Sequence, residues 1–571
     1  MRIGIFFGGP AREREISFAG GKTTFNNINR DLFEPVLVFV DSFGQFIVVD
    51  PSILKNAEIR DFYPPKDAQT AYFRIYDDSL GEISLQDKTD MANQIGHKIK
   101  PQEFSLYFEF AFIAMHGPGC EDGSLQGLLE WYGIPYSGPG LLGSAIGIDK
   151  GKQNAWLKQS VEMNKKYLLL SREHYKSEPI NSLFEKIKKE LGLPLVIKSP
   201  HQGSSIGLSI LKEDDASAFD KAIKNCFFIK EIEKQEWEEK NNSEKILFIQ
   251  SMVNLDEGIG MPVVLENEII YHPNQLWEKL EIFFSENNSK AILHSIHSED
   301  DVLIEEFVKG KEFSCGVFQE PDGQKSIALP PTGIFPAAEK DQVFDFKAKY
   351  QSTETRKEIP IRTSMENLHT IQSKVSKAFD DLGMGVCARI DGFLMEDNTI
   401  WLHDPNTIPG MSPASLIFKQ SAEIGLSITD TITYFIRQSL RERLKNGKNY
   451  VIFESILKNL DEKIQENLAS RKNSEIKSFC LDANSNNKEE EFQQVLMEVH
   501  RIKVESKFDF QVKLINHPVK NEIILDSSHL IKSNWRELDE LIQEGVHPLI
   551  QENRIKAQKI TQFYTNSHAS N

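Results

Sequence analysis

The sequence predicts a multidomain α/β protein, and three observations support this class. The chain has 571 residues, several times the usual domain size of about 100–150 residues. An apolar strand at residues 3–7 leads into Gly8-Gly9-Pro10, and helical spacing follows over residues 15–29, before a second strand at residues 36–40. Strand and turn signals return after residue 301. This alternation is typical of open sheets whose ligands bind beyond the carboxyl ends of the strands.

Composition and charge exclude several classes of protein. Hydrophobic residues make up 40% of the chain and charged residues 26%, which is enough apolar surface for buried cores. The net charge of −18 repels phosphate backbones, and no Lys/Arg stripe interleaved with aromatics is present, so we expect no nucleic-acid partner. No uninterrupted apolar stretch approaches about 18 residues, so we expect no membrane span. Five separated cysteines without a CxxC pair, and a start without a signal-peptide pattern, predict a cytoplasmic protein.

The chain is predicted to fold as four regions. The run at residues 231–245 is so charged that it is typical of a solvated helix or loop, and we interpret the segment around it as an insertion. The tail is rich in Lys, Glu and Asn, and its pattern predicts one long helix at Trp535–Phe563. The predicted regions are a first domain at residues 1–146, a central lobe at 147–300 with the insertion at about 212–300, a C-terminal lobe at 301–445, and an appended mixed α/β domain at 446–571.

A hairpin within residues 385–415 carries the most informative polar side chains. Residues 388–395 and 399–404 alternate as strands around Asp397-Asn398, two residues that tolerate the left-handed backbone of a two-residue turn. A turn centred there places Asp391 opposite Asp404, and Arg389 opposite Asn406. We expect these four residues to share one face with Phe393, Met395, Ile400 and Leu402.

Facing carboxylates on paired strands lie about 4.5–5.5 Å apart at Cβ and repel each other. A divalent cation would relieve that repulsion, since Mg²⁺ takes hard oxygen ligands such as carboxylates and substrate phosphates. The side chain of Asn406 adds a carbonyl oxygen. We therefore predict a metal site at Asp391, Asp404 and Asn406. The alternatives are a solvated hairpin, or carboxylates neutralised by Arg389.

Residues 195–207 predict a strand, a loop of small residues and a returning strand. Lys198 on the entering strand supplies positive charge, and the loop containing Ser204 and Ser205 lets backbone N–H groups approach an anion. The segment lacks the GxxxxGK[ST] pattern of a Walker A loop. It could instead close over phosphates as a movable flap, although Gly-Ser loops are often ordinary turns.

Two further segments carry charged residues that invite a ligand-binding interpretation. Residues 302–313 predict strand, turn and strand, with Glu305 interrupting an apolar run. We interpret Glu305 as the acceptor for an adenine amine and Glu312 as the acceptor for ribose hydroxyls, while the alternative for Glu305 is a solvent-facing strand carboxylate. Lys349 and Tyr350 lie in a polar segment whose charges are ordinarily solvated.

Taken together, five segments in this order resemble the D-alanine:D-alanine ligase family of the ATP-grasp superfamily. They are HGPGCEDGSLQG from His116, IPYSG with the DK pair ending at Lys150, the QGSSIG loop, AKY ending at Tyr350, and RID…DPNTIPGMSPAS from Arg389. The resemblance leaves out the insertion, much of residues 45–105 and the tail after about 445. It implies a Rossmann-like first domain followed by two ATP-grasp lobes that sandwich ATP.

The resemblance also implies a reaction. ATP phosphorylates the carboxylate of one D-alanine, and the amine of a second D-alanine attacks the acyl phosphate, giving the dipeptide used in peptidoglycan synthesis. It implies a homodimer whose small-molecule partners are D-alanine and ATP. The implied cofactor ligands are Lys150, Lys198, Ser205 and Lys349 for phosphates, Glu305 and Glu312 for adenosine, and Asp391, Asp404 and Asn406 for two Mg²⁺ ions, which Mn²⁺ can replace.

Substrate roles follow from the same resemblance. Glu13 would bind the first substrate's ammonium group in a hydrogen-bonded set with Ser204 and Tyr350, and His116 would lie near that substrate. Arg389 and the backbone N–H of Gly410 would stabilise the oxyanion of the tetrahedral intermediate, a kind of preorganised electrostatics with large rate effects. The second substrate's carboxylate would go to Ser415.

Four positions depart from the family pattern, and they leave alternatives for the function. Asp404 stands where Glu is usual, which withdraws the carboxylate by about one 1.5 Å bond; Ser199, Gln202 and Cys120 replace Pro, Glu and Gly. The alternatives are a ligase for another dipeptide and a degenerate nucleotide-binding scaffold, but a pure scaffold would not need the acyl-transfer residues. A dinucleotide oxidoreductase is disfavoured because the first turn lacks GxGxxG.

Overall fold

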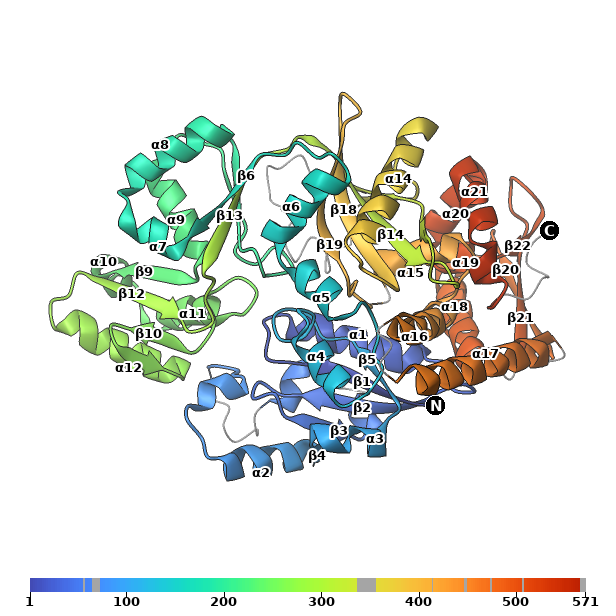
Figure 1. The fold of residues 1–571 in the computed structure, drawn as a ribbon, viewed down its shortest axis with the longest axis horizontal. Coiled ribbons are helices and arrows are strands. Elements are labelled where there is room, and N and C mark those ends of the chain that lie inside the picture. Colours follow the sequence, from blue (N-terminus) through green and yellow to red (C-terminus); the bar gives the residue numbers. More distant parts are fainter. Residues whose placement is uncertain are drawn as a thin grey trace.

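The computed structural model has five β-sheets in its described part, with helices packed around them (Figure 1). No helix among the described residues is both long and apolar enough to cross a membrane. The described residues are 1–54, 57–63, 72–335, 356–412, 414–445, 449–472, 475–505 and 508–564.

The first sheet follows the predicted pattern and delivers a loop to its carboxyl edge. Gly8 ends the first strand, which lies inside the sheet, with a φ of +92°, and a side chain there would come within 2.5 Å of the carbonyl oxygen of Val40. The turn therefore needs glycine, and residues 9–13 leave the sheet where open sheets bind ligands. The strands run in the order β4 (His97–Ile99), β3 (Phe46–Val49), β2 (Glu34–Val40), β1 (Arg2–Gly8) and β5 (Phe110–Ile113), with α1 (Arg14–Asn27) following β1.

The central sheet is antiparallel, and two amphipathic helices cover one of its faces. Leu183 and Ile187 of the first helix and Phe219 of the second are buried against apolar strand residues. The sheet has the order β6 (Tyr167–Ser171), β13 (Asp301–Glu306), β7 (Leu195–Lys198) and β8 (Ser209–Leu211), and the helices are α8 (Ile180–Leu191) and α9 (Ala216–Cys226).

The third sheet carries the predicted hairpin at its edge. Helix α14 (Met365–Asp381) packs on it with Leu368, Ile371 and Val375 buried. The strand order is β17 (Arg356–Glu358), β16 (Thr332–Phe335), β14 (Gly310–Gln319), β18 (Cys387–Met395) and β19 (Ile400–Asn406), with β15 (Ser326–Ala328) also paired to β14. Helices α5 (Leu141–Ile148), α6 (Lys150–Ser160), α15 (Leu416–Glu423) and α16 (Ile428–Leu444) also contact this sheet, whereas α4 (Ser124–Trp131) packs on the first sheet.

The charged run at residues 231–245 is more ordered than predicted. It contains the end of a strand, a short helix and the start of another, and it buries Trp237 to 1% exposure among apolar neighbours. The sheet here has the order β11 (Glu268–Ile270), β10 (Val263–Leu265), β12 (Lys290–Ser295) and β9 (Ile229–Glu233), with α10 (Lys234–Glu238), α11 (Asn242–Val253) and α12 (Pro273–Ser285).

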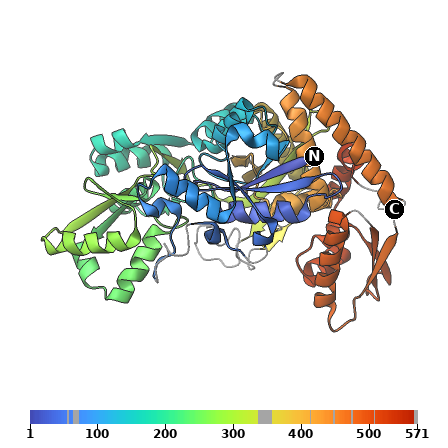
Figure 2. The same cartoon turned by 90° about the horizontal axis from the view of Figure 1, so that it is seen from below.

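The tail is packed into the rest of the molecule, at the end opposite to the insertion (Figures 1 and 2). Leu549 lies in the core of the third sheet, and Tyr564 lies in the large core that includes α16. The long helix predicted at Trp535–Phe563 is wrong, because Gly545 with a φ of +74° and Pro548 break it. The tail comprises α17 (Tyr450–Lys472), β20 (Ile476–Asp482), α18 (Lys488–Glu505), β21 (Asp509–Ile515), β22 (Glu522–Leu525), α19 (Ser527–Leu530), α20 (Trp535–Glu544), α21 (Pro548–Lys556) and α22 (Gln558–Thr561).

Candidate active site

Glu13 and Ser204 meet although they are far apart in the chain. Glu13 directly precedes α1 and is buried, and the hydroxyl of Ser204 donates a hydrogen bond to its Oε1 atom. A side chain at Gly203 would come within 2.5 Å of the Glu13 carboxylate, so the glycine lets the loop approach this carboxylate closely. The first loop of the N-terminal sheet and the Gly-Ser loop therefore face one another. Their predicted partner Tyr350 lies outside the described residues.

His116 lies in the same neighbourhood. Its Nδ1 atom is 3.7 Å from Glu121 Oε2, and its buried Nε2 atom has no hydrogen-bond partner among the described residues. Burial opposes the charged imidazole, but the nearby carboxylate of Glu121 raises the pKa of His116 above its ordinary value. Burial, with the charge of Glu121, also raises the pKa of Glu13. The unpartnered Nε2 atom is thus available to a ligand beside Glu13.

The Gly-Ser loop is anchored by charged and polar contacts at its base. The ammonium group of Lys150, at the start of α6, donates to the Gln202 carbonyl at 2.6 Å. His201 lies 3.7 Å from Asp149 and 2.8 Å from Glu299, and these two carboxylates raise the pKa of His201 to about 9. Ser205 lies at the loop tip in left-handed conformation, with a φ of +63°.

Lys198 joins two predicted functional carboxylates. Its ammonium nitrogen lies 3.1 Å from Glu305 Oε2 and 3.4 Å from Asp404 Oδ1. Burial alone would lower the pKa of Lys198, but the charges of Asp404 and Glu305 raise it above its ordinary value. Burial alone would raise the pKa of Asp404, but Lys198 and Lys150 lower it well below its ordinary value. The residues predicted to contact phosphate, adenosine and metal therefore share one electrostatic network.

Two residues that sequence reasoning missed complete the surroundings of Glu305. Lys165 lies 2.7 Å from Glu305 Oε2, and the amide of Asn154 donates to Oε1 at 2.7 Å. Glu305 is only 2% exposed, so the solvent-facing interpretation of this carboxylate is wrong. Burial opposes ionisation, but Lys165 and Lys198 lower the pKa of Glu305 to about 2. No local pattern marks Lys165, which precedes β6 in an otherwise polar stretch.

The hairpin differs in register from the prediction. The backbone N–H of Met395 donates to the Thr399 carbonyl, which closes a three-residue loop in which Asn398 has a φ of +67°. With this loop length, Asp391 lies opposite His403 and not opposite Asp404. An irregularity near Asp404, whose φ is +44°, restores the expected pairing of Arg389 with Asn406. The prediction that Ile400 and Leu402 share one face with the polar residues of the hairpin is also wrong, because both side chains point into the core.

The predicted metal ligands have oxygen atoms of the right kind. Asp391 is buried and accepts hydrogen bonds from Ser314 Oγ at 2.7 Å and Arg389 Nε at 3.2 Å. The amide nitrogen of Asn406 donates to the Asp404 carbonyl at 2.9 Å, which leaves its side-chain oxygen for a ligand. Among the described residues, no group of three or more His, Cys, Asp or Glu side chains is arranged to hold a metal. Two carboxylates plus an amide oxygen still suit Mg²⁺.

The remaining predicted residues lie around this network. Gly410 is buried in the loop between β19 and α15, and Ser415 directly precedes α15, with its hydroxyl 3.1 Å from that of Ser412. Glu312 is half-buried on β14 and pairs with Phe393 of β18. Lys349 lies outside the described residues.

Comparison with known proteins identifies the family. The profile for the D-ala D-ala ligase N-terminus matches residues 2–139, and that for the D-ala D-ala ligase C-terminus matches residues 157–232 and 282–437. The chain belongs to the D-alanine–D-alanine ligase family. It is therefore an ATP-dependent ligase of this family. The predicted fold class is confirmed: an N-terminal domain, an ATP-grasp-like part and an extra C-terminal segment. Residues 233–281 and the tail are unmatched.

Individual relatives are similar over most of their length. The D-alanine–D-alanine ligase of Geobacillus thermodenitrificans is 25% identical over 455 residues, covering 79% of this chain and 99% of that protein. The enzyme of the same name from Clostridium botulinum strain Alaska E43 is 27% identical over 445 residues, covering 77% and 99%.

Solved structures show the same fold. The D-alanine-D-alanine ligase of Coxiella burnetii superposes with a TM-score of 0.51 at 18% identity, covering 80% of this chain and 99% of that one. The VanG D-Ala:D-Ser ligase of Enterococcus faecalis gives 0.50 at 19% identity, covering 77% and 99%. At these identities the likeness concerns the fold.

Proposed function

We propose that this ligase joins two D-alanine molecules into D-alanyl-D-alanine, with ATP as the energy source and an acyl phosphate as the intermediate. The observation that carries the proposal is the contact between Glu13 and Ser204. It brings an acidic group suited to an ammonium ion against a loop suited to phosphate. The curated relatives named D-alanine–D-alanine ligase support the choice of substrate.

In the proposed reaction, Glu13 and His116 orient the first D-alanine. A carboxylate oxygen of that substrate attacks the γ-phosphorus of ATP, ADP leaves, and Lys150 and Lys198 neutralise the phosphate charge. Asp391, Asp404 and Asn406 would hold Mg²⁺, which when bound supplies further positive charge beside the phosphates. Glu305 and Glu312 would hold the adenosine.

The second D-alanine would attack with a neutral amine. Its nitrogen forms a bond to the carbonyl carbon of the acyl phosphate, and the carbonyl oxygen becomes an oxyanion. Arg389 and the backbone N–H of Gly410 would stabilise that charge. Donors that are already oriented need little reorganisation energy at the transition state. The carbonyl then re-forms, the C–O bond to phosphate breaks, and the nitrogen loses one proton to the departing phosphate, which completes the peptide bond. Ser415 would receive the carboxylate of this second substrate.

The proposal is tested by incubating the purified protein with Mg-ATP and single amino acids. We expect ADP formation with D-alanine and none with L-alanine, and a product with the mass of the dipeptide. D-Alanine labelled with ¹⁸O in its carboxylate should transfer one label to the released phosphate, as an acyl phosphate requires. A D-Ala:D-Ser product would assign a different second substrate, and ATP binding without turnover would favour the scaffold alternative.

A further inference from the structure

Arg12, next to Glu13 in the chain, reaches out of its own domain. Its Nη1 atom donates to the carbonyls of Leu255 at 3.1 Å and Gly258 at 3.0 Å, and its Nη2 atom donates to the carbonyl of Ile259 at 2.5 Å. The guanidinium carbon also lies 3.9 Å from the centre of the Phe228 ring. Arg12 is only 8% exposed. A buried guanidinium with three carbonyl acceptors and an aromatic face is a well-defined anchor.

All three acceptors belong to residues 233–281, the segment that the family profile leaves unmatched. The loop that carries them is fixed by its own hydrogen bonds, because the side chain of Asn254 accepts from the backbone N–H groups of Asp256 and Glu257. The backbone N–H of Ile259 also donates to the Met252 carbonyl at 2.8 Å. The segment thus presents a preformed set of carbonyls to Arg12.

Arg14 holds the other side of Glu13 from within the N-terminal domain. It donates to the carbonyls of Ala11 and Pro10, each at 2.9 Å, and pairs with Asp78 at 2.9 Å. Glu13 therefore sits between two buried guanidinium anchors. One of them fixes the loop to its own domain and the other fixes it to the insertion.

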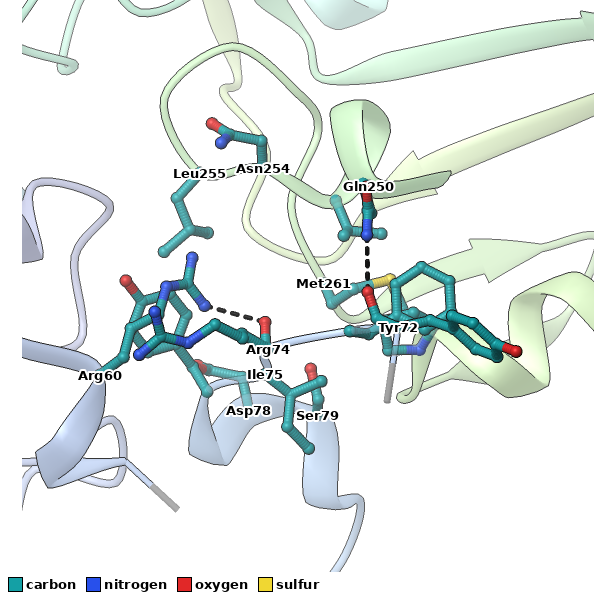
Figure 3. Close-up of a pocket in the computed structure, with 14 residues that line it drawn as sticks. Arg60, Tyr72, Arg74, Ile75, Asp78, Ser79, Gln250, Asn254, Leu255 and Met261 are labelled. Atoms are coloured by element: carbon teal, nitrogen blue, oxygen red, sulfur yellow. Dashed lines mark hydrogen bonds between the residues drawn. The ribbon is translucent and has the colours of Figure 1, made fainter. Parts of the chain in front are cut away.

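The two parts also meet through apolar side chains, because Phe73 and Ile75 of the N-terminal domain are buried in the same core as Ile259 and Met261. A pocket of about 370 Å³ lies beside this core and is lined by Ile75, Asp78, Leu255 and Met261 (Figure 3). The hydrogen bonds of Arg12 add a polar attachment between the insertion and the loop of Glu13.

We propose that Arg12 is a positioning residue, and that the insertion acts through it to hold Glu13 in place for the first substrate's ammonium group. This inference rests on the proposed function, in which Glu13 binds that ammonium. The insertion then contributes to first-substrate affinity without touching the substrate. If the Glu13 carboxylate is displaced, the affinity for the first substrate should fall steeply, because small misplacements of a charged binding group are costly.

The test compares Arg12→Ala and Arg12→Lys with Arg443→Ala. Arg443 is a matched control because it is also buried, donates to the carbonyls of Gly138 and Pro139, and stacks 4.0 Å from the Tyr136 ring. We expect Arg12→Ala to raise the KM of the first D-alanine about tenfold, with the KM of the second D-alanine and of ATP nearly unchanged. Arg12→Lys should recover part of the loss, and Arg443→Ala should change none of the three.

Hydrogen–deuterium exchange of residues 10–17 provides a readout that does not depend on turnover. We expect faster exchange there in Arg12→Ala and wild-type exchange in Arg443→Ala. Unchanged exchange in Arg12→Ala, or equal KM changes in both alanine variants, would overturn the inference about Arg12. The proposed function would still stand as long as the wild type shows D-alanine-dependent turnover. A wild type without such turnover would overturn the function, and faster exchange in Arg12→Ala would still support the anchoring role. If Arg12→Ala fails to fold, Arg12→Lys gives the same two readouts.

Discussion

Lys198 and Asp404 are 206 positions apart in the chain, yet the ammonium nitrogen of one lies 3.4 Å from the carboxylate of the other. The same ammonium lies 3.1 Å from Glu305. Lys198 and Glu305 come from the central sheet and Asp404 from the third sheet, so this contact joins the two sheets. If Asp404 binds a metal ion as proposed, the same carboxylate would face both the ion and Lys198, so nucleotide binding would act on a contact between the two sheets.

Asp391→Asn should abolish phosphoryl transfer while the fold stays intact. The substitution removes one charge from the proposed metal ligands but keeps the side-chain shape that accepts from Ser314. We expect ADP formation to fall on the order of 100-fold or more, because metal-derived charge stabilisation is worth several kcal/mol. Asp397→Asn, on the exposed hairpin loop, is the control. Normal turnover of Asp391→Asn with Mg-ATP would show that the metal assignment is wrong.

Arg389→Ala should lower kcat far more than it weakens ATP binding. Loss of one oxyanion donor typically costs about 100- to 1,000-fold in kcat, whereas the adenosine contacts proposed here lie on other strands. Steady-state kinetics with ATP as the varied substrate measures both parameters, and Arg389→Lys tests whether charge alone suffices. Arg389 also pairs with Asp391, a proposed metal ligand. Equal losses in kcat and in ATP affinity would therefore indicate that Arg389 acts through the metal site, and would contradict its oxyanion role.

Glu305 should make stability depend on pH in the acid range. Its folded-state pKa of about 2 lies below the ordinary value of 4.5, so the ionised carboxylate stabilises the protein above pH 4.5. That contribution is lost as the pH falls from 4.5 toward 2. At neutral pH, Glu305→Gln should lower the free energy of unfolding by about 3–5 kcal/mol, because Lys165 and Lys198 lose a buried partner.

Urea unfolding between pH 2 and pH 7 checks this prediction. The difference between the wild type and Glu305→Gln should shrink as the pH falls through the window from 4.5 to 2. Glu306→Gln changes the neighbouring, half-buried residue and serves as the control. A difference that stays constant with pH would mean that the charge of Glu305 is not what stabilises the network.

Leu549→Ala should destabilise the whole protein and not only the tail. Leu549 is fully buried in the core of the third sheet, so the substitution should lower the free energy of unfolding by about 2–5 kcal/mol. Ile555, on the same helix, is 66% exposed, so Ile555→Ala should change the free energy of unfolding by less than about 0.5 kcal/mol. Denaturant unfolding followed by circular dichroism measures both variants. A separate early transition for the tail would contradict its integration.

Local patterns in the sequence carried much of the fold and of the candidate site. The turn at Gly8, the strand before Lys198 and the hairpin from Arg389 to Asn406 all follow from glycine placement and apolar alternation. The hairpin register did not, because Asn398 closes a three-residue loop in place of the expected two-residue turn. One residue more in a loop moves every later side chain by one position.

The sequence by itself determined the family, the kinds of chemical group available and the order of the segments that carry them, because these are local properties of the chain. The tertiary structure alone decided which groups meet. Lys165 and Asn154 surround Glu305, and Arg12 reaches into the insertion, through contacts that span more than 100 positions. Side-chain burial and charge pairing over such spans depend on how the sheets pack, and no local period records that packing.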